Sequence, residues 1–163
     1  MTITVEIGGR EEIKRALRAA RKDALRGLAK GLVKEAEGVM RLSKPEVPVN
    51  EGILRASGFV RRPMPDGRGM SITMGYGGAA KSYALYVHEG TGPAVGRPAF
   101  FPPVKPFMEW AKRVLGDENL GFVVARAVGR KGLKPTKYLE RPLRKRARGM
   151  GLRLAKAMRK EIR

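Results

Sequence analysis

One long amphipathic helix is the feature that most constrains the fold of this chain. Between residues 11 and 42, apolar side chains recur at steps of three and four, which places them in one stripe along a helix. Gly27, Gly31 and Gly38 interrupt the pattern, and each glycine weakens a helix by up to about 1 kcal/mol. We therefore expect another backbone to pack closely against the helix at these glycines. The apolar stripe consists of Ile13, Leu17, Ala20, Ala24, Leu28, Leu32, Ala36 and Val39.

Shorter elements complete the predicted fold. Alternating apolar side chains predict strands, and a turn through Asp66-Gly67 predicts an antiparallel β-hairpin. Residues 82–90 fit a strand or a short helix, and we favour the helix. The elements are a strand at 2–7, the helix at 11–42, a β-hairpin at 57–76 (strands Ser57–Arg62 and Met70–Tyr76), a Pro-rich loop at 91–106, two short helices at 106–130 and a basic helix at 138–162. Together they predict an α+β fold in a single domain, 1–163. The N- and C-terminal helices would pack on a small antiparallel sheet, with a helical hairpin inserted near 106–130.

The loop at 91–106 is rich in proline and contains two phenylalanines. Its five prolines in sixteen residues predict a rigid, extended segment rather than a flexible linker. Phe100 and Phe101 would be ordinary residues in a core. In a loop they are candidates for contact with a partner protein, and both interpretations stay open at this point.

The charge of the chain is strongly positive and unevenly distributed. The sequence has 35 Lys and Arg against 15 Asp and Glu, and residues 130–163 alone have fourteen against two. Such a field attracts phosphate polymers or acidic protein surfaces, although a solvated basic face gives the same pattern. The absence of Cys and Gln, with only two Asn, favours a thermophilic source. The candidate face for DNA or an acidic partner comprises Arg141, Arg144, Lys145, Arg148, Lys156 and Arg159.

Composition argues against several classes of protein. Without cysteine the chain has no disulfide and no thiolate zinc site, and a single histidine, His88, excludes a multi-histidine metal site. No apolar run approaches the length needed to span a bilayer. The N-terminal residues lack the basic start and apolar middle of a signal peptide. We therefore expect a soluble protein made in a cytoplasm, without a cofactor and without a membrane partner.

A glycine-rich stretch, GYGGAAKS at residues 75–82, comes close to a phosphate-binding loop. It follows a strand-like run and ends in Lys-Ser, but Ala80 stands where the motif requires its second glycine. The helix predicted after it is too short to direct its N-terminus at a phosphate. No Asp follows an apolar strand, where a magnesium ligand is needed. We therefore interpret the stretch as a turn in which Gly75, Gly77 and Gly78 supply positive φ.

His88 and Glu89 form the only acid–base pair of note. Adjacent residues on an element point in different directions, and no second carboxylate cluster accompanies the pair. We therefore favour a structural pair in which Glu89 accepts hydrogen bonds from the Gly-Thr turn that follows. No Ser/His/Asp set is evident either, and we expect that the chain is not an enzyme.

Three short segments, in this order along the chain, resemble a known family. The first, in NEGILRAS, includes Gly52, Leu54, Arg55 and Ser57; the second, YALYVHEGT, includes Tyr83, Ala84, Glu89, Gly90 and Thr91; the third, KGLKPTKYLERPL, includes Gly132, Pro135, Tyr138, Leu139 and Leu143. Over about residues 10–160 the chain resembles the tail-completion, or head–tail joining, family of long-tailed phages. Glu51 stands where that family usually has Thr, and Tyr138 stands where it has Phe.

This resemblance implies a structural protein of the virion that is not an enzyme. Its expected place is the head–tail junction or the tail, with the host cytoplasm as the site of assembly. Its expected partners are other neck and tail proteins (portal, adaptor, tail terminator or tail tube), and copies of the chain would form a ring around the tail axis, with non-specific contact with DNA. The charge leaves a second hypothesis open, a basic nucleic-acid-binding protein of a thermophile.

Overall fold

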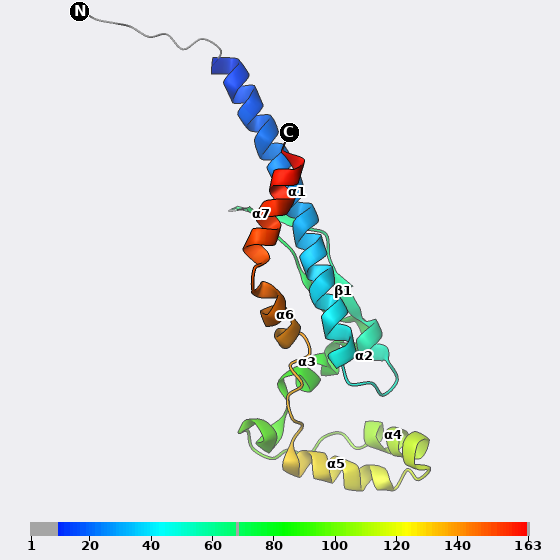
Figure 1. The fold of residues 1–163 in the computed structure, drawn as a ribbon. Helices are drawn as coiled ribbons and strands as arrows, with labels where there is room; N and C mark the ends of the chain where they lie inside the picture. The colour runs from blue at the N-terminus through cyan, green and yellow to red at the C-terminus, as the bar shows by residue number, and fades with distance from the viewer. Residues whose placement is uncertain (1–9, 68, 163) are drawn as a thin grey trace, which may run out of the picture. The chain divides into compact units, whose positions relative to one another are not determined.

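The computed structural model describes residues 10–67 and 69–162, with the side chains of residues 10, 79, 81 and 82 left out (Figure 1). The strand predicted at 2–7 lies outside the described residues. The α+β class that the sequence predicts is confirmed. The helices are α1 (Arg10–Ser43), α2 (Ile53–Ala56), α3 (Lys81–Glu89), α4 (Lys105–Leu115), α5 (Leu120–Lys131), α6 (Glu140–Ala147) and α7 (Met150–Glu161). The strands are β1 (Gly58–Val60), β2 (Met64–Asp66), β3 (Gly69–Ser71) and β4 (Met74–Tyr76), and short 3-10 turns are η1 (Lys44–Glu46), η2 (Gly78–Ala80) and η3 (Gly92–Val95).

The chain divides into two compact units where the sequence predicts a single domain. Unit 1 takes its described residues from 1–40, 60–74 and 143–163, and unit 2 consists of 41–59 and 75–142. Neither unit is a continuous stretch of the chain. The division therefore follows tertiary contacts between segments that lie far apart in the chain.

In unit 1, α1 and α7 pack closely at the glycines of the long helix. A Cβ atom added at Gly27 would lie 2.6 Å from the carbonyl oxygen of Ala157 and 2.7 Å from the Cα atom of Met158. The expected close approach of a second backbone is therefore confirmed at Gly27. At Gly31 the tight neighbour is the side chain of Leu154, 2.9 Å from the added atom. The α7 backbone therefore excludes a side chain at Gly27, whereas the atoms nearest to Gly31 and Gly38 belong to side chains, so the expected approach of a backbone is wrong at these two positions.

A buried carboxylate joins α1 to both C-terminal helices. Glu35 is 4% exposed. It accepts two hydrogen bonds from the guanidinium of Arg153, each 2.8 Å long, and three of 2.9 to 3.1 Å from Arg146. The hydrogen bonds from Arg153 lower the pKa of Glu35 below its ordinary value, burial opposes the shift, and Arg146 adds to it. The Arg146 guanidinium lies over Gly38, where an added Cβ would be 2.6 Å from its Cζ atom.

The basic helix predicted at 138–162 is two helices. The chain turns between α6 and α7 because Gly149 adopts a left-handed φ of 72°, a conformation that glycine takes without strain. Arg153 stabilises the turn by donating hydrogen bonds to the carbonyl oxygens of Arg148 (3.0 Å) and Arg146 (2.5 Å). The prediction of one continuous helix is therefore wrong at this position.

The predicted hairpin at 57–76 is divided into two small sheets. β2 pairs with β3 in antiparallel register, with Asp66 opposite Gly69, and β1 pairs with β4 in a separate two-stranded sheet. Pro63 stands between β1 and β2 and has no backbone N–H to donate. The strand predicted at Met70–Tyr76 is interrupted accordingly and forms β3 and β4.

In unit 2, α4 and α5 form the predicted helical hairpin. Gly116 ends α4 with a left-handed φ of 78°. Gly121 lets the two helices approach closely, because an added Cβ there would lie 2.5 Å from the backbone nitrogen of Met108. The helix favoured at 82–90 is confirmed as α3, one residue earlier than expected.

Candidate functional site

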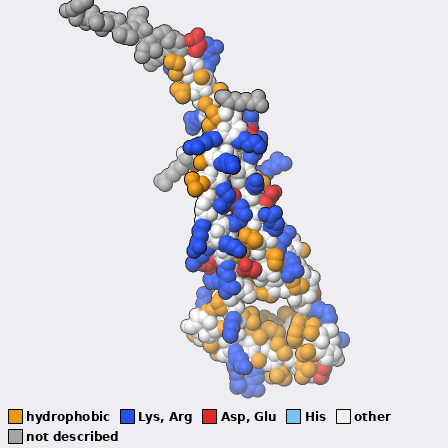
Figure 2. Space-filling model, in the orientation of Figure 1, with side chains coloured by type: hydrophobic (Ala, Val, Ile, Leu, Met, Phe, Trp, Pro, Cys, Tyr) orange, Lys and Arg blue, Asp and Glu red, His pale blue; other side chains and the backbone are white. Residues whose placement is uncertain are grey.

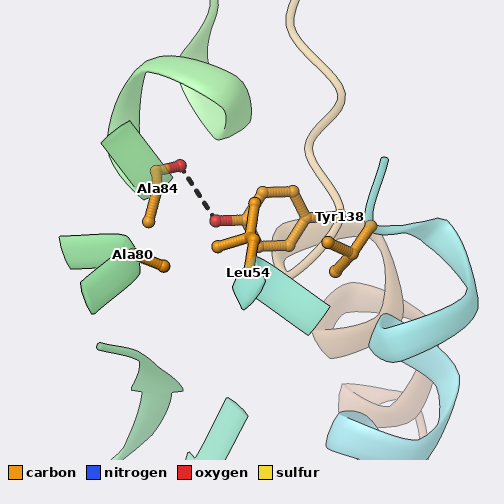
Figure 3. Packing of buried hydrophobic residues seen from close by; sticks show 5 residues of the cluster. Leu54, Ala80, Ala84 and Tyr138 are labelled. Atoms are coloured by element: carbon orange, nitrogen blue, oxygen red, sulfur yellow. Dashed lines mark hydrogen bonds between the residues drawn. The ribbon is translucent and has the colours of Figure 1, made fainter. Parts of the chain in front are cut away.

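The three segments that carry the family resemblance meet in the core of unit 2. Leu54 from the first segment, Ala84 from the second and Tyr138 from the third are buried in one cluster with Val47 and Ala80. Figure 3 shows Tyr138 extending toward Ala84, whose carbonyl oxygen accepts a 2.9 Å hydrogen bond from the phenol. Positions far apart in the sequence therefore form a single packing unit.

Tyr138 is the centre of this cluster. Its ring meets Tyr76 edge to face at a centroid distance of 5.0 Å and His88 at 4.9 Å. The hydroxyl of Tyr76 is in turn hydrogen-bonded to the buried Ser43 at 2.8 Å. Burial raises the pKa of Tyr138 to about 12, and the neighbouring Tyr76 and Tyr83 add to the shift. Tyr138 is therefore a neutral hydrogen-bond donor at ordinary pH, with a structural role.

The second and third segments are also hydrogen-bonded to each other along the backbone. Thr91 and Leu133 exchange two backbone bonds, of 2.9 and 3.2 Å, and the Thr136 hydroxyl donates to the carbonyl oxygen of Val87 at 2.7 Å. Gly90 adopts a φ of 78°, and a Cβ there would lie 2.5 Å from the Leu133 oxygen. The Glu-Gly-Thr sequence is therefore explained by a tight crossing of two segments.

The first segment supports the cluster from the other side. Gly52 has a φ of 79° at the start of α2. Arg55 donates a 3.3 Å hydrogen bond to the carbonyl oxygen of Val47, and the Ser57 hydroxyl donates to that of Leu54 at 2.8 Å. These contacts fix the loop before α2 against the core.

In the third segment, Leu139 packs partly buried against the cluster, and the Pro135 nitrogen lies 2.9 Å from where a Cβ on Gly90 would be.

His88 and Glu89 contact each other, and Glu89 has a different further partner from the one expected. The Nδ1 atom of His88 is 2.8 Å from a Glu89 carboxylate oxygen, and the backbone N–H of Glu140 donates to the other ring nitrogen at 3.3 Å. Since the second nitrogen accepts, the proton is on Nδ1 and points at Glu89. Both ring nitrogens are thus occupied. Although the two residues are adjacent in the sequence, their side chains contact each other, so the expectation that they point in different directions is wrong.

Lys137, rather than the Gly-Thr turn, supplies the other partner of Glu89. Its ammonium group forms an ion pair with the Glu89 carboxylate and also lies 3.3 Å from Glu140. The hydrogen bond from Lys137 lowers the pKa of Glu89, and that from His88 adds to the shift. Lys137 adopts a φ of 52°, which is uncommon outside glycine. The surrounding contacts impose this conformation, among them a 3.0 Å bond from the Lys137 N–H to the His88 carbonyl oxygen.

The glycine-rich stretch at 75–82 lies beside the same core. Ala80 is fully buried in the cluster, and the preceding β4 belongs to a two-stranded sheet. Of its three glycines only Gly78 has a positive φ, of 58°. Gly75 and Gly77 instead lie under the ring of Phe59, where added Cβ atoms would be 3.6 and 3.3 Å away. The stretch is a turn, but the role predicted for Gly75 and Gly77 is wrong.

An apolar groove, here called the aromatic groove, opens on unit 2. Its cavity measures about 650 Å³. Phe100 and Phe101 are 40% and 59% exposed along it, and the Tyr83 and Tyr86 rings are exposed too. Figure 2 shows hydrophobic side chains gathered around a hollow in the region of α4 and α5. The groove is lined by Tyr83, Tyr86, Val87, Thr91, Gly92, Arg97, Pro98, Phe100, Phe101, Pro102, Pro103, Phe107, Val128 and Leu133.

The basic face predicted on the C-terminal helices is solvent-exposed. Figure 2 shows Lys and Arg side chains spread over α1 and α7. By contrast, Arg146 and Arg153, which belong to the same two helices, form ion pairs with Glu35. The exposed members of the predicted face are Arg141, Arg144, Lys145, Arg148, Lys156 and Arg159.

Some residues of the aromatic groove could not be grouped from the sequence. Tyr86, Phe107 and Leu133 join the groove from three separate elements, and no local pattern groups them. Glu35 did leave a signal, because it falls at the spacing of the apolar stripe between Leu32 and Val39. An acid in that position indicates a buried ion pair.

Comparison with known proteins gives no relative. No family model matches the chain, and neither a curated protein nor a solved structure is significantly similar to it. Among residues 10–67 and 69–162, no helix is both long and apolar enough to cross a membrane. The same residues contain no group of three or more His, Cys, Asp or Glu side chains placed to bind a metal ion.

Proposed function

We propose that this chain is a structural protein of the neck or tail of a long-tailed phage and acts by assembling with other virion proteins. The observation that carries the proposal is the convergence of the three family-like segments in the core of unit 2. Short motifs that resemble a family by chance have no reason to pack together. Motifs that specify a common fold do, because they supply its turns and its buried contacts.

The surfaces of the molecule are consistent with a role in assembly. An aromatic groove and a field of exposed cations are features that a protein buries against neighbours. In a ring, a charge of +20 on each copy would cause strong repulsion unless acidic neighbours or DNA offset it. The proposed neighbours are portal, adaptor, tail terminator or tail-tube proteins, which the resemblance implies.

Antibody labelling of virions tests this function. Antibodies against the chain should label the head–tail junction or the tail in electron micrographs of the phage whose genome encodes it. Genes for portal, capsid and tape-measure proteins should lie nearby. Labelling confined to host cells, with none on virions, would contradict the proposal.

Nucleic-acid binding is a second candidate, favoured by the exposure of the basic face. Affinity for a short DNA duplex should then fall steeply with salt, because bound phosphates release counterions. Substituting Ala for Lys145, Lys156 or Arg159 should each reduce the slope of log affinity against log salt by about 1. An affinity that hardly changes between low and moderate salt would rule out phosphate recognition by this face.

A further inference from the structure

The aromatic groove is built before any partner arrives. The backbone N–H of Phe100 donates a 3.1 Å hydrogen bond to the carbonyl oxygen of Gly129 on α5. A Cβ on Gly129 would lie 3.1 Å from the Cδ atom of Pro102, so the loop rests directly on the helix. Prolines before and after the two phenylalanines further restrict the loop. Phe100 and Phe101 are therefore presented in fixed positions, and binding would lose little conformational entropy.

Side chains, rather than a free strand edge, are what the groove offers to a partner. Thr91 and Leu133 already exchange their backbone hydrogen bonds, and Phe100 uses its N–H on α5. A partner strand therefore finds few open backbone groups along these walls. Recognition by apolar side chains that enter a groove is the mode that remains, as in the binding of an amphipathic helix.

The charge around the groove favours an acidic partner. Among the described residues that line it, Arg97 is the one with a charged side chain. Arg130 and Lys131, in the last turn of α5, and Lys134 are exposed and lie close to the lining residues Val128 and Leu133 in the sequence. A second copy of the chain is a poor occupant, since each copy has a formal net charge of +20 and would be repelled by the cations near the groove.

We propose that the aromatic groove binds an acidic amphipathic segment of another protein. Large apolar side chains of that segment occupy the groove, while its carboxylates face Arg97 and the cationic end of α5. The identification of the partner as a virion protein rests on the function proposed above. The preference for an acidic, apolar segment rests on the groove alone.

Three designed peptides of roughly 16 residues, long enough for partial helicity, probe the groove. The first has Leu and Phe on one helical face and Glu elsewhere, the second replaces Glu with Lys, and the third keeps Glu but replaces Leu and Phe with Ser. Fluorescence anisotropy with the full chain at moderate salt should show the first peptide binding at least about tenfold more tightly than either control. Equal binding of the third peptide would mean that charge alone attracts the probe and would overturn the proposal.

Matched variants then locate the binding. Phe101→Ser should weaken binding of the first peptide by about tenfold, as expected for a central aromatic contact. Phe101→Leu should retain most of the affinity, which separates a loss of apolar contact from a loss of folding. Arg97→Glu should weaken the acidic peptide selectively. Leu152→Ser is the control, because Leu152 is 79% exposed on α7 and outside the groove.

Two further outcomes would also overturn the proposal. One is unchanged peptide binding by a folded Phe101→Ser protein. The other is concentration-dependent self-association, seen by sedimentation, that disappears in the same variant, since a second copy would then occupy the groove. Peptide binding without labelling of virions would reject the phage function but support the proposed role of the groove. Labelling of virions without peptide binding would support the phage function and reject the proposed role of the groove.

Discussion

The two units of this molecule are stabilised by different interactions. Unit 1 has an acid, Glu35, among its buried residues, and its helices meet through glycines. Unit 2 is centred on an apolar cluster around Tyr138. Unit 1 also has the larger excess of positive charge: it has 21 Lys and Arg against 8 Asp and Glu, whereas unit 2 has 14 against 7.

This contrast extends to the surfaces that each unit presents. Cations that exceed the few available acids stay exposed on unit 1, because an unpaired charge cannot be buried. Unit 2 instead leaves aromatic rings exposed along its groove, among them Phe100 and Phe101 on a loop that is hydrogen-bonded to α5. One unit is therefore suited to contact by charge and the other to contact by apolar side chains.

Removing the buried carboxylate should give the largest effect. Glu35→Gln leaves Arg146 and Arg153 without their counterion, and we expect a loss of about 2–3 kcal/mol in the free energy of unfolding, because breaking a buried pair leaves charge uncompensated. Chemical denaturation followed by circular dichroism measures it. Glu37→Gln is the control, since Glu37 is exposed on the same helix.

The pH dependence of stability sharpens this prediction. The pKa of Glu35 is lower in the folded chain than its ordinary value of 4.5. Its stabilisation is therefore present above pH 4.5 and is lost as the pH falls through the folded pKa. Glu35→Gln should show a shallower loss of stability in acid than the parent chain. A residual loss should remain, because the pKa values of Glu89 and Glu161 are also lowered. Identical acid profiles for both proteins would contradict the role of Glu35.

A pair of glycine substitutions tests the close packing of unit 1. Gly27→Ala should destabilise the chain by about 1–2 kcal/mol, because the added methyl meets the α7 backbone. Gly151→Ala, in α7, has open space around the added atom and should stabilise the chain by up to about 1 kcal/mol. Thermal unfolding distinguishes the two. Shifts of the same sign and size would show that the helices do not approach as closely as the structure has them.

The smallest effect is expected from Tyr138→Phe in unit 2. Losing the hydrogen bond to the Ala84 carbonyl oxygen should reduce stability by about 1 kcal/mol. The folded pKa of Tyr138, about 12, is above its ordinary value of 10.0. The contribution of the neutral Tyr138 phenol to the free energy of unfolding is therefore complete below pH 10 and is lost as the pH rises toward 12. Denaturation at several alkaline pH values should show a shallower decline for Tyr138→Phe, while the exposed Tyr86→Phe should behave like the parent chain.

Most of the helical elements were predictable from local patterns. The apolar stripe predicted α1 to within one residue at each end. The break at Gly149 was not predicted, because glycine permits a left-handed turn without requiring one. The division of the hairpin depended on which backbone groups found partners across the sheets.

The candidate site was less predictable, because it depends on contacts between distant residues. The sequence showed the three segments separately, but it did not show that they meet around Tyr138. The partners of Glu89 were misassigned, because Lys137 lies 48 residues away in the chain. Phe100 and Phe101 could be called core or surface with equal reason until the loop was seen resting on Gly129.

The α+β class, the helices with clear local periodicity, the excess of positive charge and the absence of cysteine chemistry follow from local patterns. These properties depend on neighbouring residues or on composition alone. Contacts between distant segments instead determine which acid is buried, which imidazole nitrogen bears the proton and which aromatic rings face solvent. Each of these depends on burial and on hydrogen bonds between segments far apart in the chain, and no local pattern encodes them.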